Sequence, residues 1–112
     1  CCITGINNSA LLQASHIVDW SIDEQNRTNP ENGLCLNALF HNAYDENLLG
    51  ITPDYDIIIS EEFLGNKLRE VESSTKDYIW GFNNKKLIMP SRFCPDKELL
   101  AQHFEKFRHH VA

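Results

Sequence analysis

Long apolar runs are absent from this sequence: in 112 residues, no more than three consecutive ones are Ala, Val, Ile, Leu, Met, Phe, Trp, Tyr or Cys. A membrane-spanning helix needs about 20 predominantly apolar residues, so the sequence predicts no membrane partner. The chain also lacks an opening basic segment followed by an apolar one, which would indicate a secretory signal. These absences favour a cytoplasmic protein.

Cysteine is too sparse for a disulfide framework, with four residues at positions 1, 2, 35 and 94. Adjacent Cys1 and Cys2 are poor partners for each other. Cys1 and Cys35 also lack a second cysteine three residues further on, so the Cys-x-x-Cys pairs typical of structural zinc sites are missing. Reduced, buried thiols are the simplest interpretation.

The length fits a single domain over residues 1–112. No internal repeat or low-complexity tract interrupts it, so we expect one globular unit. The chain starts at Cys1 without an initiator Met. We therefore expect the C-terminal part of a larger protein, with an upstream domain as a partner.

Positive charge is scarce in the first half of the chain, where residues 1–62 carry ten acidic residues against Arg27 alone. Residues 63–112 carry nine Lys and Arg against six acidic residues, and the net charge is −6. An acidic segment suits a divalent cation better than a phosphate group, although an ordinary solvated surface is an equal alternative. The basic residues that we consider for DNA phosphate contacts, each also explained by simple solvation, are Lys67, Arg69, Lys85, Lys86 and Arg92.

The first half predicts the order strand, loop, strand, helix. Residues 11–18 form the first strand, polar and turn-forming residues 19–32 form a loop, and residues 34–36 return antiparallel. Asn37 is a helix N-cap, and the helix should run to about Asn47. His41 and Asp45 are four residues apart and so share one face of this helix.

The second half predicts a β-hairpin of residues 48–52 and 57–60 around the turn sequence Pro53-Asp54-Tyr55-Asp56. A helix is expected at 68–72 with a break at 73–75, and a short strand at 85–89. Pro95 opens an amphipathic helix that should dock on the hairpin. Its apolar stripe consists of Leu99, Leu100, His103, Phe104, Phe107 and Val111.

Five segments in order resemble the HNH endonuclease family: Cys1–Gly5, Leu11–Ile17, Trp20–Ser21, Pro30–Leu34 and His41–Asp45. More narrowly, Leu87–Pro90 and Leu100–His103 are similar to the tail of the HNH domains at the C-terminal ends of bacterial restriction-type endonucleases. The resemblance implies an α+β fold with a ββα-metal core, an added β-hairpin and a C-terminal helix. It also implies cleavage of DNA.

The resemblance assigns roles to individual residues. His16 would be the general base, since an imidazole can take a proton from water near neutral pH, and Asn32 would brace the loop that holds it. His41 and Asp45 would bind one divalent metal ion, with Mg²⁺, Mn²⁺ or Ni²⁺ expected before Zn²⁺. Ser15 stands where many members have an acidic or His ligand, and a hydroxyl is a poor substitute.

Simpler explanations exist for each of these residues. A lone His on a strand is usually structural, Asn32 also suits a turn before Gly33, and His41 and Asp45 suit a hydrogen-bonded pair on a helix surface. We weigh a metal-dependent endonuclease, as in the nuclease domain of a restriction enzyme, against a degenerate HNH fold that only binds DNA or a protein. A third interpretation is a homodimerising module that uses the stripe of the last helix.

Overall fold

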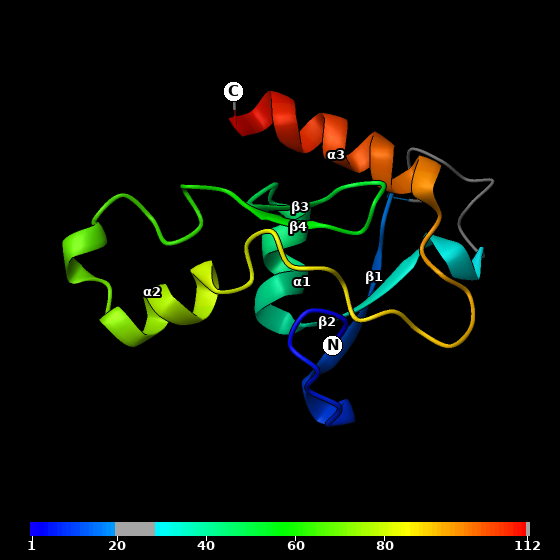
Figure 1. Ribbon diagram of the computed structural model, residues 1–112, viewed down its shortest axis with the longest axis horizontal. Helices are drawn as coiled ribbons and strands as arrows, with labels where there is room; N and C mark the ends of the chain where they lie inside the picture. The colour runs from blue at the N-terminus through cyan, green and yellow to red at the C-terminus, as the bar shows by residue number, and fades with distance from the viewer. Residues whose placement is uncertain (20–28, 112) are drawn as a thin grey trace.

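The computed structural model describes residues 1–19 and 29–111, with the side chain of residue 111 excepted. Within them the fold is mixed α+β, as predicted, with two small antiparallel sheets and three α-helices (Figure 1). No helix in the described part of the chain is long and apolar enough to cross a membrane.

The first sheet pairs β1 (Leu12–His16) antiparallel with β2 (Gly33–Asn37), and α1 (Ala38–Asp45) follows directly. The Asn37 side chain caps this helix, because its Oδ1 accepts a hydrogen bond of 2.9 Å from the backbone N–H of Phe40. The predicted strand, strand, helix order is thus confirmed. Of the predicted loop, residues 20–28 lie outside the described part.

The first helix ends at Asp45, two residues earlier than predicted. Asn47 adopts a positive φ of 58°, a conformation that stops an α-helix and that asparagine tolerates better than most residues. The backbone N–H of Leu48 then donates to the carbonyl of Ala43 over 2.8 Å, which satisfies a carbonyl at the helix end.

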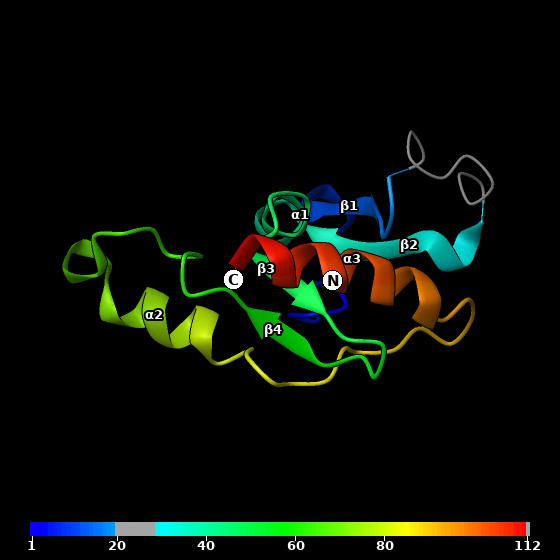
Figure 2. The same cartoon turned by 90° about the horizontal axis from the view of Figure 1, so that it is seen from above.

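The second sheet is the predicted hairpin, with β3 (Leu49–Ile51) antiparallel to β4 (Ile57–Ile59). The final helix, α3 (Lys97–Val111), packs against β3 as predicted, and Figure 2 shows it lying across the hairpin. It begins two residues after Pro95, because Asp96 caps it by accepting backbone hydrogen bonds from Glu98 and Leu99.

Two sequence predictions in the second half are wrong. The expected break at 73–75 is the start of α2 (Ser73–Trp80), where Ile79 anchors the helix in the core, while residues 68–70 form only a 3₁₀ turn. Serine and threonine suit a helix start as well as a turn, so the local signal was ambiguous. Residues 85–89 make a single β-bridge, between Asp56 and Lys86, and no strand.

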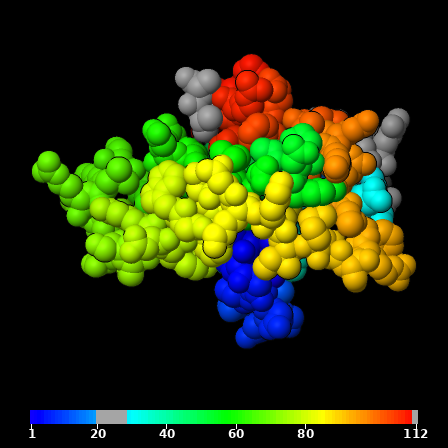
Figure 3. Space-filling view, viewed as in Figure 1, coloured from blue at the N-terminus to red at the C-terminus, as the bar shows by residue number. Residues whose placement is uncertain are grey.

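The 85–89 segment is nevertheless bonded on two sides. The N–H of Ile57 donates to the carbonyl of Lys85 over 2.8 Å, and the N–H of Ile88 donates to the carbonyl of Cys2 over 2.8 Å. It therefore joins the start of the chain to β4. Figure 3 shows this yellow segment lying across one face, with the blue N-terminal residues emerging beneath it.

The core lies where α1, β3 and α3 meet, and its largest fully buried side chains include Tyr44, Phe40 and Phe107. The stripe of α3 is used inside the molecule, since Leu99, Leu100, His103 and Phe107 are all buried within the chain. These four side chains of the stripe are therefore not free for a homodimer contact.

Gly50 permits the close approach of α3 to β3. A Cβ atom at this position would lie 2.5 Å from Cδ1 of Phe107, well inside van der Waals contact. We expect Gly50→Ala to lower the free energy of unfolding by about 1–3 kcal/mol through overpacking. Urea unfolding measures this, with Gly33→Ala as control because its Cβ meets nothing nearer than 3.6 Å. Equal stability of the two variants would contradict the tight contact.

Candidate active site

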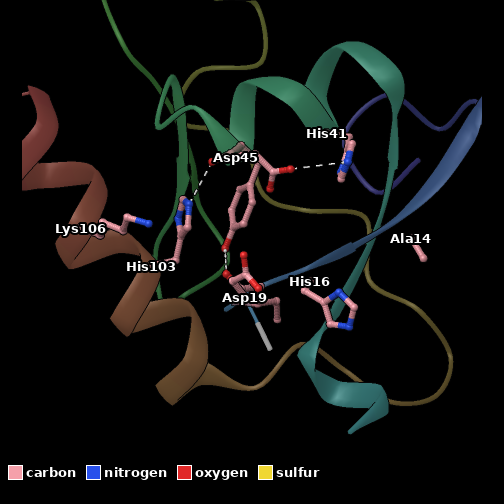
Figure 4. A pocket seen from close by; sticks show the side chains of 9 residues that line it. Ala14, His16, Asp19, His41, Asp45, His103 and Lys106 are labelled. Atoms are coloured by element: carbon pink, nitrogen blue, oxygen red, sulfur yellow. Dashed lines mark hydrogen bonds and ion pairs between the residues drawn. The ribbon is translucent and has the colours of Figure 1, made fainter. Parts of the chain in front are cut away.

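A cavity of about 350 Å³ opens between β1, α1 and α3 (Figure 4). It brings three predicted site residues together, His16 from β1 and His41 and Asp45 from α1. The polar side chains that line it are His16, Asp19, His41, Tyr44, Asp45, His103 and Lys106. A candidate base and a candidate cation-binding pair thus share one solvent-accessible space.

His16 is the last residue of β1, and its side chain is exposed. Successive side chains on a strand point to opposite faces, so Ser15 faces the other way. Ser15 is only 1% exposed and does not line the cavity. Its Oγ has no hydrogen-bond partner within the described residues. The structure therefore does not bring Ser15 to the proposed metal ligands.

His41 and Asp45 lie one turn apart on α1, with His41 Nε2 3.5 Å from Asp45 Oδ2. Two ligands at about 2.1 Å from one metal ion, at neighbouring coordination positions, are separated by about 3 Å, so a small side-chain adjustment lets this pair share a cation. Across residues 1–19 and 29–111, no group of three or more His, Cys, Asp and Glu side chains is placed to hold a metal. The pair fits a cation that keeps water or substrate at its other positions.

Asn32 holds the backbone immediately after His16. Its Oδ1 accepts a hydrogen bond of 2.9 Å from the N–H of Val18, and its Nδ2 donates one of 3.1 Å to the carbonyl of the same residue. The carbonyl of Asn32 also accepts from the N–H of Ile17 over 3.2 Å. Asn32 is 1% exposed and does not line the cavity, so it contacts the site through the backbone.

Tyr44 connects the three walls of the cavity. Its hydroxyl donates to the carbonyl of Ile17 over 3.1 Å, and its backbone carbonyl lies 3.0 Å from Nε2 of His103. The rings of Tyr44 and His103 are stacked, with centroids 3.6 Å apart and planes 12° apart. The end of β1, the helix α1 and the helix α3 are therefore held to one another through a single residue.

The buried imidazole of His103 is neutral at physiological pH, because desolvation lowers its pKa to about 4. Since a carbonyl oxygen only accepts, Nε2 must carry the proton that faces Tyr44, which leaves a lone pair on Nδ1. Nδ1 has no hydrogen-bond partner within the described residues. His103 thus serves the packing of α3 beside the cavity.

The five basic residues selected from the sequence are exposed, but none lines the cavity. Lys86, for example, pairs with Asp56 at 2.9 Å and donates to the carbonyl of Asp54. Sequence reasoning missed Asp19, His103 and Lys106. The available signal for Lys106 was its position three residues after His103, at the edge of the apolar stripe of α3.

Residues 1–52 match a family model described as HNH endonuclease. The match confirms the resemblance and spans β1, β2, α1 and β3, with all four of His16, Asn32, His41 and Asp45 inside it. By its description, this is a family of endonucleases. The match ends before α3, so His103 and Lys106 lie outside it. Among curated proteins, none matches the chain.

We expect Asn32→Ala to lower the free energy of unfolding by about 2–4 kcal/mol. The substitution removes both side-chain hydrogen bonds and leaves the N–H and carbonyl of Val18 unpaired in a buried place. Chemical denaturation followed by circular dichroism measures the loss. Asn29→Ala is the control, since Asn29 caps the 3₁₀ turn before β2 by accepting a hydrogen bond from the backbone N–H of Glu31. A loss no larger than that of the control would contradict the bracing role.

The pKa of His103 predicts a pH-dependent stability. Because the pKa is lowered in the folded state from 6.5 to about 4, the unfolded chain takes up the proton first as the pH falls. The contribution of neutral His103 to the free energy of unfolding is complete above pH 6.5. It falls by up to about 3 kcal/mol as the pH is lowered to about 4. His103→Gln should flatten this part of the stability profile, measured by urea unfolding at each pH. Identical pH profiles for the two proteins would disprove it.

Proposed function

We propose that this chain is a metal-dependent HNH endonuclease domain that hydrolyses DNA phosphodiester bonds. The observation that carries the proposal is the single cavity that joins His16 to the pair of His41 and Asp45. Hydrolysis of a phosphodiester needs a base for the attacking water and positive charge for the phosphate oxygens. Candidate side chains for both requirements line the cavity, and all three lie within the segment that matches the nuclease family.

His16 acts as the general base in this proposal. Its imidazole is exposed at the end of β1, where it can accept a proton from a water molecule facing the scissile phosphorus. Asn32 positions this histidine, because its hydrogen bonds to the backbone of Ile17 and Val18 fix the chain just after His16. The reaction needs no covalent intermediate.

His41 and Asp45 would hold one divalent cation. When bound, the cation stabilises negative charge on the phosphate and on the leaving oxygen. One imidazole and one carboxylate, with other positions open to water and phosphate, favour Mg²⁺, Mn²⁺ or Ni²⁺ over a structural zinc ion. Ser15 is left out of this set because it is buried away from the cavity.

The proposal also includes an upstream domain and DNA contacts outside the cavity. With a net charge of −6, the chain is poorly suited to bind DNA tightly alone, so an upstream domain of a restriction-type enzyme would supply most of the recognition. Lys67, Arg69, Lys85, Lys86 and Arg92 would add contacts to phosphates distant from the cleavage point.

We expect His16→Ala to reduce nicking of supercoiled plasmid in Mn²⁺ by at least about 100-fold, the usual contribution of a positioned base. Calorimetric titration should show unchanged Mn²⁺ affinity for His16→Ala and weaker affinity for Asp45→Asn. His109→Ala is the matched control, because this exposed histidine on α3 pairs with Glu105 and lies off the cavity. Undiminished nicking by purified His16→Ala protein would overturn the assignment.

A second candidate is a degenerate HNH fold that binds DNA or a protein without cleaving. The observation in its favour is that the described part of the cavity offers one His and one Asp as an adjacent ligand pair, with Ser15 turned into the core. This candidate predicts DNA binding that is indifferent to Mn²⁺ and no nicking by the wild type. Nicking lost with His16 would exclude it.

A further inference from the structure

The C-terminal helix α3 supplies one wall of the cavity. His103 and Lys106 line it from α3, which lies beside α1 in Figure 4. Both residues come from beyond the segment that matches the nuclease family, which ends at residue 52. The site therefore includes an element that the family match does not describe.

Helix α3 is held firmly enough to position a side chain at the cavity. The ring of Phe107 lies over Gly50 so closely that a Cβ atom there would be 2.5 Å away. Leu100 is fully buried, and His103 both stacks on Tyr44 and contacts its carbonyl at 3.0 Å. Lys106 follows His103 by three residues and precedes Phe107 by one, so its backbone is fixed between two anchored positions.

Its positive charge distinguishes Lys106 from the other described residues that line the cavity. Among the described residues that line it, Lys106 is the one Lys or Arg, while Asp19 and Asp45 are acidic. A smaller hollow of about 130 Å³ adjoins the first one. It shares His103, Lys106, Asp19 and Ile17 with the cavity and continues to Gln102. Lys106 thus lines both hollows, which together form one groove beside α3.

We propose that Lys106 binds a backbone phosphate of the polynucleotide next to the one that is cleaved. The inference rests on the proposed function, which places the scissile phosphate at His16 and the pair on α1. A chain that leaves this point along the groove would carry its neighbouring phosphate past Lys106. The ammonium group offers three hydrogen-bond donors and a full positive charge to that phosphate. Lys106 then sets the direction in which the nucleic acid crosses the site.

The test measures DNA binding without metal, by fluorescence anisotropy of a labelled duplex oligonucleotide in EDTA across a range of salt concentrations. Loss of one phosphate contact reduces the slope of log affinity against log salt by about 0.9, which corresponds to about tenfold weaker binding at 50 mM salt. We expect this for Lys106→Gln and near wild-type behaviour for Lys106→Arg. Arg108→Gln is the control, with the same change of charge on the same helix but at an exposed residue off the cavity.

The result separates this inference from the proposed function. Equal salt slopes for Lys106→Gln and Arg108→Gln would overturn the phosphate contact, even where the wild type nicks plasmid DNA. A slope that changes only with Lys106 would support the contact, even where the wild type fails to nick and the nuclease proposal falls. Circular dichroism of each variant confirms that it is folded, which the exposed position of Lys106 leads us to expect.

Discussion

The geometry of the candidate site depends on the pairing of the Asn32 amide with the backbone of Val18. Both polar groups of the side chain are used, at 2.9 and 3.1 Å, so the amide has one orientation. It ties the chain just after β1 to the residue just before β2, two points separated by a long connection. This tie adds to the pairing of β1 with β2 and to the Tyr44 hydrogen bond in fixing the end of β1, which carries His16, relative to the helix that carries His41 and Asp45. A buried, fully paired polar group of this kind specifies position more than it adds stability.

Tyr44 extends that constraint from the first sheet to the C-terminal helix. Its hydroxyl holds Ile17 and its backbone carbonyl faces His103, so one residue of α1 contacts the elements on both sides of the cavity. The stacked ring of His103 excludes water from the contact, and the same burial lowers its pKa. The neutral imidazole of His103 therefore anchors α3 against Tyr44 of α1. This explains why a histidine, rather than another leucine, occupies that position of the stripe: it packs and also satisfies a carbonyl.

The sequence predicted the local parts of this arrangement and missed those set by tertiary contacts. Periodicity and capping identified β1, β2, α1 and the hairpin, and the spacing of His41 and Asp45 follows from helix geometry alone. The start of α2 at Ser73 was not predictable in the same way, because it depends on burial of Ile79 against residues distant in the chain. Ser15 and Lys106 show the same limit. Which face of β1 is buried, and which residue of α3 reaches the cavity, are decided by packing between elements.

In the proposed function, the electrostatics of the cavity would link metal binding to DNA binding. Asp19 and Asp45 are acidic residues of the cavity wall, and the chain as a whole is negative, so the chain itself offers a phosphate little attraction. A divalent cation at His41 and Asp45 would reverse the local sign where the phosphate must lie, while Lys106 offers positive charge further along the groove without any metal. Two sources of positive charge at different points constrain a polynucleotide in direction as well as position. A single cation would attract the phosphate but leave the strand free to turn about it. In the proposal, the second positive charge, that of Lys106 on α3, would set the direction in which the strand crosses the site.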